Sequence, residues 1–189
     1  MLLPSTLQSA KDWIQKALPS GGTAIDATVG NGHDTLFLAE QVGHHGHVMG
    51  FDIQKEAIAS AHQRLHLAGQ DEQVQLVTLG HHLMDQVLPS EWKEQIHVFM
   101  FNLGYLPHGN PEIITFSDTT LPALQIACEW LAPGGLITIA LYTGHPGGQQ
   151  ESDAVIHWAK QLPPKKYQVL WQQIVNRTHA PSLLVIEKR

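Results

Sequence analysis

The sequence predicts an α/β protein with a single, mostly parallel sheet. Three features lead to this prediction: strand-like and helical segments alternate through residues 23–162, a glycine-containing turn follows the first strand, and two strand-like segments end the chain. Strands that are separated by helices indicate a parallel sheet with right-handed crossovers. Because no helix separates the last two segments, we expect a terminal hairpin that inserts one antiparallel strand into a seven-stranded sheet.

The chain is predicted to begin with a helix at about residues 5–18 that packs against the core. Ser5 and Gln8 have the spacing of a capping box, and apolar residues follow at helical intervals. Pro133-Gly134-Gly135 is expected to turn the chain sharply into the fifth strand. Strands are expected at residues 23–27, 47–52, 74–79, 96–102, 136–142, 168–175 and 182–187, and helices at residues 35–42, 56–68, 83–88, 119–131 and 151–162.

Length and composition favour one domain, residues 1–189, in a reducing compartment. A chain of 189 residues can bury one core, and a hydrophobic fraction of 43% is ordinary for a globular protein. The single cysteine, Cys128, cannot form an internal disulfide. The sequence has neither an apolar run long enough for a membrane span nor a secretory signal at its start. We therefore predict a cytoplasmic protein.

The turn after the first strand is the strongest chemical signal in the sequence. It reads Ile25-Asp-Ala-Thr-Val-Gly-Asn-Gly-His-Asp-Thr35, and the next strand ends at Asp52. Gly30 and Gly32 would allow the backbone to approach a ligand without interference from a Cβ atom. Asp52, at the tip of its strand, would accept hydrogen bonds from both hydroxyls of a ribose. This arrangement predicts a nucleoside-binding unit.

The acidic residues of the turn indicate which nucleoside it binds. Thr35 stands where the dinucleotide motif G-x-G-x-x-G has its third glycine, and Asp26 and Asp34 flank the turn. Two carboxylates disfavour a pyrophosphate, whereas they favour a ligand with a cationic amino-acid tail. S-adenosylmethionine has such a tail, so we predict it as the cofactor. The alternative is a tight strand–helix turn without a ligand, in which Asp34 caps the helix.

A second signal follows the fourth predicted strand, at the edge where α/β sheets bind ligands. The residues are Phe101-Asn-Leu-Gly-Tyr-Leu-Pro107. Methyltransferases that modify exocyclic amines have a similar Asn/Asp-Pro-Pro-Tyr loop, in which oxygen atoms accept from the amine and an aromatic ring stacks on the base. Asn102 would orient the nucleophile and Tyr105 would supply the ring, although Leu103-Gly104 replaces the two prolines. The alternative is a simple turn with Tyr105 half-buried beneath it.

Three motifs in the same order resemble those of one bacterial family. They are the turn at residues 26–35, the loop at residues 101–107 and Tyr142-Thr-Gly-His-Pro-Gly147. Over essentially its whole length, the chain is similar to the YtqB-type family labelled putative rRNA methylases, whose characterised MnmM-like members are tRNA 5-aminomethyl-2-thiouridine methyltransferases. The resemblance implies a class I S-adenosylmethionine-dependent methyltransferase fold, Rossmann-like, with the last strand antiparallel. It also implies N-methylation of the 5-aminomethyl group of wobble uridine 34 in the tRNA anticodon loop, giving 5-methylaminomethyl-(2-thio)uridine.

Two positions differ from the pattern of that family. His108-Gly109-Asn110 stands where the family commonly has Gly-Gly-Asp, and Phe116 follows Thr115 where the family commonly has a second threonine. A further threonine pair, Thr119-Thr120, is retained. The substrate contacts that the resemblance implies are Tyr105, Pro107, Thr119 and Thr120.

The predicted cofactor contacts come from the first turn, the end of the second strand and the loop after the fourth. His81 follows the third strand at the ligand edge, where it would lie beside the adenine. A buried structural histidine is the alternative for this residue. The full set is Asp26, Thr28, Gly30, Asn31, Gly32, Asp34, Thr35, Asp52, Ile53, Gln54, His81, Asn102, Leu103 and Gly104.

Methyl transfer to an amine requires alignment more than acid–base groups, because the sulfonium is already activated. An aliphatic amine is largely protonated near neutral pH, so a desolvated pocket or a proton acceptor is needed. The candidate catalytic residues are Asn102, through its carbonyl group, Tyr142 and His145. The sequence does not choose among these three as the proton acceptor.

The charge of the chain is the main argument against an RNA substrate. The formal net charge is −6, and Lys165-Lys166 and Lys188-Arg189 are the only basic pairs. Protonated histidines, or a homodimer with a shared positive surface, would offset this charge. Two alternative functions stay open: a methyltransferase that acts on rRNA or a small amine, and a non-catalytic S-adenosylmethionine-binding protein. No metal is expected, because His44-His45-Gly46-His47 has no carboxylate or cysteine at ligand spacing.

Overall fold

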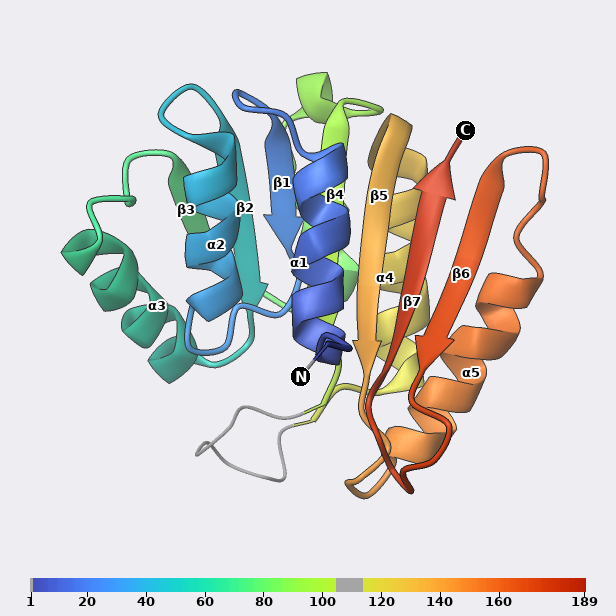
Figure 1. The fold of residues 1–189 in the computed structure, drawn as a ribbon. Coiled ribbons are helices and arrows are strands. Elements are labelled where there is room, and N and C mark those ends of the chain that lie inside the picture. Colours follow the sequence, from blue (N-terminus) through green and yellow to red (C-terminus); the bar gives the residue numbers. More distant parts are fainter. Residues whose placement is uncertain (1, 105–113) are drawn as a thin grey trace.

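The computed structural model describes residues 2–104 and 114–189, and these residues form a seven-stranded sheet with helices on both faces (Figure 1). The strands are β1 (Thr23–Asp26), β2 (His47–Asp52), β3 (Val74–Thr78), β4 (Ile96–Asn102), β5 (Leu131–Leu141), β6 (Tyr167–Gln173) and β7 (Ser182–Lys188). The helices are α1 (Thr6–Ala17), α2 (His33–Val42), α3 (Lys55–Leu67), α4 (Ser117–Trp130) and α5 (Gly148–Lys160), with two short 3₁₀ helices, η1 (His81–Gln86) and η2 (Ser90–Trp92).

The topology confirms the predicted fold class. The strand order is β3-β2-β1-β4-β5-β7-β6, the pairs among β1 to β5 are parallel, and β7 is antiparallel to both of its neighbours. The terminal hairpin thus inserts one antiparallel strand, as expected from the absence of a helix between its strands. The strand order reverses between β1 and β4, and open α/β sheets form their ligand crevice at such a switch point.

The side chains of β4 show how the sheet separates two cores. Val98 and Met100 pack with α1, α2 and α3, whereas Phe99 and Phe101 face the cluster that includes α4 and α5. This alternation follows from the two-residue period of a strand. Figure 1 shows the same division, with α1, α2 and α3 on one face of the sheet and α4 and α5 on the other.

Helix α1 begins where the sequence predicted it. The Ser5 hydroxyl accepts a hydrogen bond from the Gln8 backbone N–H at 3.1 Å, which satisfies one of the first N–H groups of the helix. The Gln8 side chain donates to Asp12 instead of returning to Ser5, so only half of the capping box forms. The helix lies against β4, β5 and β7, which places its exposed face far from α4 and α5.

The start of β5 differs from the prediction. Leu131 already pairs with Ile96, and the register then shifts before Leu136 pairs with Val98. Pro133-Gly134-Gly135 therefore lies within β5 as an irregularity, with Gly134 at φ +78°, and does not precede the strand. The other element boundaries agree with the predicted ranges to within a few residues.

Candidate active site

Hydrogen bonds bring the predicted site residues together at the carboxyl ends of β1, β2 and β4. The Asn102 N–H donates to Thr28 Oγ1 at 2.7 Å, and the Gly30 N–H donates to Asp52 Oδ2 at 2.9 Å. These bonds tie the turn after β1 to β4 on one side and to β2 on the other. The site therefore lies at the switch point of the sheet.

Asp52 both fixes the turn and presents a carboxylate to the crevice. Its Oδ2 accepts from Gly30 and its Oδ1 accepts from the Gln54 N–H, each at 2.9 Å. Each carboxylate oxygen can accept a further hydrogen bond, and Asp52 is only half-buried. The carboxylate can thus receive the two ribose hydroxyls that the sequence assigned to it.

The space next to Gly32 is filled by a helix of the protein. Gly30 and Gly32 have φ values of +51° and +76°, in the region that favours glycine. A Cβ atom on Gly32 would lie 2.7 Å from the Cα of Ala61 in α3. Arg64 of the same helix, which the sequence did not single out, donates from Nε to the carbonyl oxygen of Asn31 at 2.8 Å. Cofactor contacts from Gly32 and Asn31 stay predictions.

Asp26 and Thr35 lie beneath the turn and have no exposed surface. Thr35 Oγ1 donates to Asp26 Oδ2 at 2.6 Å, and the Thr28 N–H donates to Asp26 Oδ1 at 3.1 Å. Burial, together with the negative charges of Asp34 and Asp52, raises the pKa of Asp26 to about 7. The described placement gives both side chains a role in shaping the turn, and their contact with the cofactor stays a prediction.

Asn102 is oriented by a chain of polar contacts. Its Nδ2 donates to Asp34 Oδ2 at 2.5 Å, and Asp34 Oδ1 pairs with Lys11 Nζ of α1 at 3.0 Å. Because a carboxylate only accepts, the amide nitrogen must face Asp34 and the amide oxygen must face away from it. Asn102 Oδ1 is buried and has no hydrogen-bond partner among the described residues. Buried acceptors are normally paired, so this oxygen marks a position for a donor on a ligand.

The backbone after β4 is held in one conformation. The Leu103 N–H donates to the Ala140 carbonyl at 3.1 Å, and the Leu103 side chain is buried in the core. Gly104 has a φ of +139°, which other residues rarely adopt. Its N–H donates to Thr115 Oγ1 at 2.8 Å, and its carbonyl accepts from the Thr115 N–H at 2.9 Å. Any cofactor contact from Leu103 or Gly104 would therefore come from backbone atoms.

Glu151, in the first turn of α5, is a residue that the sequence analysis missed. Its side chain is 3% exposed, and its two oxygens accept from Thr115 Oγ1 at 2.7 Å and from Thr120 Oγ1 at 2.6 Å. Through Thr115, the carboxylate is connected to the backbone of Gly104. The only signal in the sequence was an acidic residue at the start of a helix, which normally indicates a favourable charge at the helix dipole.

The predicted substrate contacts are only partly placed by the structure. Thr120 is fully buried and bonded to Glu151, so it cannot contact a substrate directly in this conformation. Thr119 is half-buried, and its hydroxyl donates to the Phe116 carbonyl at 3.0 Å at the start of α4. Tyr105 and Pro107 lie outside the described residues, so their contacts stay predictions.

Tyr142 and His145 follow β5 at the same edge. Burial and the negative charge of Asp34 raise the pKa of the Tyr142 phenol, so this group keeps its proton near neutral pH and is a poor proton acceptor. His145 Nδ1 contacts the Pro146 carbonyl at 3.0 Å, which places the proton on Nδ1 because a carbonyl only accepts. A Cβ atom on Gly104 would lie 3.5 Å from His145 Nε2, so the imidazole borders the loop after β4.

His81 and Ile53 form the edge of the site next to β2. His81 is 8% exposed, and its Nδ1 contacts the Ala27 carbonyl at 3.1 Å, which supports the turn after β1. Burial lowers its pKa to about 4, so the ring is neutral. Ile53 is 57% exposed although it is apolar, which leaves a hydrophobic surface beside Asp52. That surface suits the face of an adenine ring.

Two further observations concern residues 2–104 and 114–189. Within these ranges, no three His, Cys, Asp or Glu side chains are grouped so that they could hold a metal ion. No helix in the described part of the chain has the length and apolar character that crossing a membrane requires.

The donor and acceptor groups of the crevice fit S-adenosylmethionine. Asp52 offers acceptors for ribose hydroxyls, and Asp34 adds a second carboxylate, which is already paired with Lys11. Asn102 adds a buried acceptor oxygen at the end of β4. Fold and site together define a class I S-adenosylmethionine-dependent methyltransferase, in which residues at the carboxyl edge hold a nucleoside and face a second substrate.

Comparisons with known proteins agree with this class. The crystal structure of a "putative rRNA-methylase" from Clostridium thermocellum is 38% identical, covers both chains completely and superposes with a TM-score of 0.95. A "putative methyltransferase" from Streptococcus mutans, in complex with SAH, is 33% identical with a TM-score of 0.89, again over both whole chains. The predicted cofactor, S-adenosylmethionine, agrees with the SAH that is bound in that relative.

The sequence comparisons identify the family. A sequence model of the family described as "Putative rRNA methylase" matches residues 48–188, so the chain belongs to this family. The Arabidopsis thaliana protein named tRNA (mnm(5)s(2)U34)-methyltransferase, chloroplastic, is 42% identical over 183 residues. The match covers 93% of this chain and 66% of that relative, so the chain spans slightly less than two thirds of its length. The resemblance seen in the three sequence motifs is thus confirmed.

Proposed function

We propose that this protein is a tRNA methyltransferase that methylates the 5-aminomethyl nitrogen of wobble uridine 34. The observation that carries the proposal is the amide oxygen of Asn102, which is buried at the end of β4 without a partner among the described residues. Its contact with Asp34 fixes the amide so that the oxygen points away from Asp34. An amine N–H is the donor that such an oxygen would receive.

The proposed cofactor is S-adenosylmethionine, which supplies an electrophilic methyl group on a sulfonium sulfur when it is bound. Asp52 would hold the ribose, and the ammonium of the cationic tail would share the Asp34 carboxylate with Lys11. Asn102 would accept one N–H of the acceptor amine and thereby direct the nitrogen lone pair along the line of transfer. Such alignment is the main contribution that a protein makes to this reaction.

The acceptor amine must be neutral before its nitrogen can react. Tyr142 keeps its own proton, so we exclude it as the acceptor of the amine proton. Asn102 can stabilise the neutral amine through its carbonyl oxygen, and His145 borders the same loop. We retain His145 as the candidate proton acceptor. The reaction is proposed to take place in the cytoplasm, as expected from the single cysteine.

The choice of tRNA is supported by the name of the Arabidopsis thaliana relative. The competing reading, methylation of rRNA or of a small amine, is supported by the family description and by the net charge of −6. A non-catalytic role would leave the orientation of Asn102 without a purpose. Two observations favour tRNA: the loop after β4 suits an exocyclic amine, and a relative of 42% identity is named a tRNA methyltransferase.

The test is to identify the methylated nucleoside. Purified protein is incubated with isotopically labelled S-adenosylmethionine and tRNA that contains 5-aminomethyl-2-thiouridine. The tRNA is then digested to nucleosides, which are separated and identified by mass spectrometry. We expect the label in 5-methylaminomethyl-2-thiouridine and none in tRNA that lacks the aminomethyl group. Label found only in rRNA or in a free amine would replace the proposed substrate. Binding of the cofactor without any labelled product would favour the non-catalytic reading.

A further inference from the structure

The chain separates its charges along the sequence. Six of the eleven Lys and Arg residues lie in residues 160–189, together with only one of the seventeen Asp and Glu residues, which is Glu187. The last thirty residues thus have a formal charge of +5, and residues 1–159, with five basic and sixteen acidic residues, have −11. Although its net charge is acidic, the chain therefore contains a basic segment, which consists of the end of α5 and the β6–β7 hairpin.

Most cations of this basic segment are available for a partner. Among the described residues, the one ion pair of the segment joins Lys188 to Glu94 at 2.9 Å, and Arg189 donates to the Gln168 side chain. Four other basic side chains are exposed and have no carboxylate within ion-pair distance in the described part of the chain. They are Lys160, Lys165, Lys166 and Arg177.

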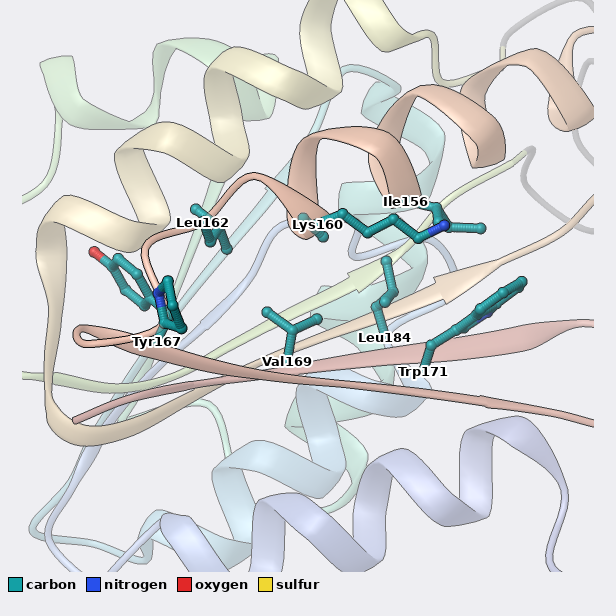
Figure 2. A pocket seen from close by; sticks show the side chains of 9 residues that line it. Ile156, Lys160, Leu162, Tyr167, Val169, Trp171 and Leu184 are labelled. Atoms are coloured by element: carbon teal, nitrogen blue, oxygen red, sulfur yellow. The ribbon is translucent and has the colours of Figure 1, made fainter.

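The same segment contains an apolar groove between α5 and the edge strand β6. Figure 2 shows Tyr167 at one end of the groove and Trp171 at the other, with Lys160 extended along the helix side. The groove has a volume of about 350 Å³. The Trp171 side chain is 42% exposed, so its ring is accessible at one end of the groove. Accessible aromatic rings among basic side chains are typical of surfaces that bind nucleic acid.

The basic segment extends to the edge that carries the candidate active site. Strand β6 has the same direction as β5, because β7 is antiparallel to both. Its seven residues span about 20 Å, from Lys165 and Lys166 at its start to the edge where Asn102 lies. Arg177, in the connection after β6, lies at that edge, as Figure 1 shows for the β6–β7 connection and the end of β5.

We propose that the basic segment, residues 160–189, is the docking surface for an RNA substrate. This inference rests on the proposed function and names the part of the protein that would hold the body of the tRNA. Phosphates would follow β6 toward the active-site edge, and Trp171 would stack on an unpaired base or pack against a ribose. The phosphate contacts would come from Lys160, Lys165, Lys166 and Arg177.

Charge complementarity favours RNA over a second copy of this chain. A two-fold symmetric dimer brings the same patch of both subunits together. An interface through this surface would place positive segments against each other, which opposes association. A polyanion instead gains affinity from each phosphate that a cation neutralises, through release of counterions.

The test measures binding of fluorescently labelled tRNA to the full chain at several salt concentrations. The variant Lys165→Gln/Lys166→Gln is compared with Lys16→Gln/Lys93→Gln, which removes the same charge from outside the basic segment. We expect the first variant to raise the Kd about 20-fold and to reduce the slope of log Kd against log salt by about 1.6, because each phosphate contact contributes roughly 0.8. The second variant should change the Kd less than about threefold.

Two single variants extend the test along the groove. Arg177→Gln should raise the Kd about fivefold and reduce the salt slope by about 0.8. Trp171→Ala should raise the Kd about tenfold without a change in slope, because stacking releases no counterions. Circular dichroism and the Kd for S-adenosylmethionine check that each variant is folded.

The outcomes separate this inference from the proposed function. Wild-type protein that methylates tRNA, together with equal Kd values for the two lysine variants, would overturn the docking surface and leave the proposed substrate intact. Wild-type protein that does not bind tRNA would overturn both. Light scattering that shows a wild-type dimer and a Trp171→Ala monomer would assign the surface to a second copy of the chain.

Discussion

The two halves of the candidate active site are built by different means. On the cofactor side, backbone N–H groups hold the functional carboxylate: Gly30 and Gln54 both donate to Asp52. On the acceptor side, side chains hold the backbone, as Thr115 does for Gly104 with the support of Glu151. The first half therefore depends on a turn conformation, and the second depends on the identity of a few polar side chains.

The halves also differ in how completely their polar groups are paired. Asp26, beneath the cofactor-side turn, has partners on both oxygens. Asn102, on the acceptor side, leaves one buried oxygen without a partner among the described residues. A paired group stabilises the fold, whereas a buried acceptor without a partner can still receive a donor from a ligand. The cofactor half is therefore held by its own hydrogen bonds, and we propose that a substrate completes the acceptor half.

The substitution Asn102→Ala should have the largest effect. We expect kcat to fall about 10²- to 10³-fold, because alignment of the amine is lost, while the Kd for S-adenosylmethionine changes less than about twofold. Single-turnover methylation and calorimetry measure the two quantities, with the exposed Gln95→Ala as a control. A loss of cofactor affinity as large as the loss in rate would place Asn102 in the cofactor half.

Glu151→Ala should test whether side chains hold the acceptor half. Removal of the buried carboxylate leaves the Thr115 and Thr120 hydroxyls without their acceptor, which should lower the free energy of unfolding by about 2–3 kcal/mol. Glu151→Gln keeps one oxygen and should recover part of this loss. Urea unfolding provides the measurement, and an unchanged midpoint for Glu151→Ala would contradict the prediction.

Asp52→Ala should affect the cofactor half alone. Loss of the ribose acceptor and of the anchor for Gly30 should weaken S-adenosylmethionine binding by about 1–3 kcal/mol, on the scale of hydrogen bonds to charged groups. Calorimetry on the folded variant measures this loss. NAD should not bind the wild-type protein comparably, and unchanged affinity of Asp52→Ala for S-adenosylmethionine would remove the ribose assignment.

The remaining prediction concerns the pH dependence of stability. The pKa of Asp26 rises from 3.8 to about 7 on folding, so the native state binds the proton more tightly than the unfolded chain. Stability should therefore decrease as pH rises from about 4 to about 7 and level off above that. Thermal unfolding of Asp26→Asn should show a flatter profile in this window. An equal slope in the variant would assign the pH dependence to other groups.

The sequence could predict the site residues that are marked by local features, but not those that reach the site from distant segments. The Asp52 carboxylate could be located because it ends the strand that follows the glycine turn and its helix. Asn102 could be located because it ends a predicted strand and is followed by Leu103-Gly104-Tyr105. These features are all local in the sequence. Lys11 and Glu151 could not be located, because each reaches the site from a helix that is distant in sequence, through contacts with Asp34 and with Thr115.

The sequence alone determined the order of strands and helices, the antiparallel insertion at the end, and the edge at which ligands would bind. Periodicity, turn residues and strand-end carboxylates are local properties, and they were sufficient for these predictions. The tertiary structure decided which polar groups form hydrogen bonds within the fold and which can still contact a ligand. Asp26 and Asp34 flank the same turn in the sequence, yet Asp26 is fully buried beneath the turn, whereas Asp34 is partly exposed and contacts Asn102 and Lys11. Burial decides between such roles, and burial depends on segments that meet only in the folded chain.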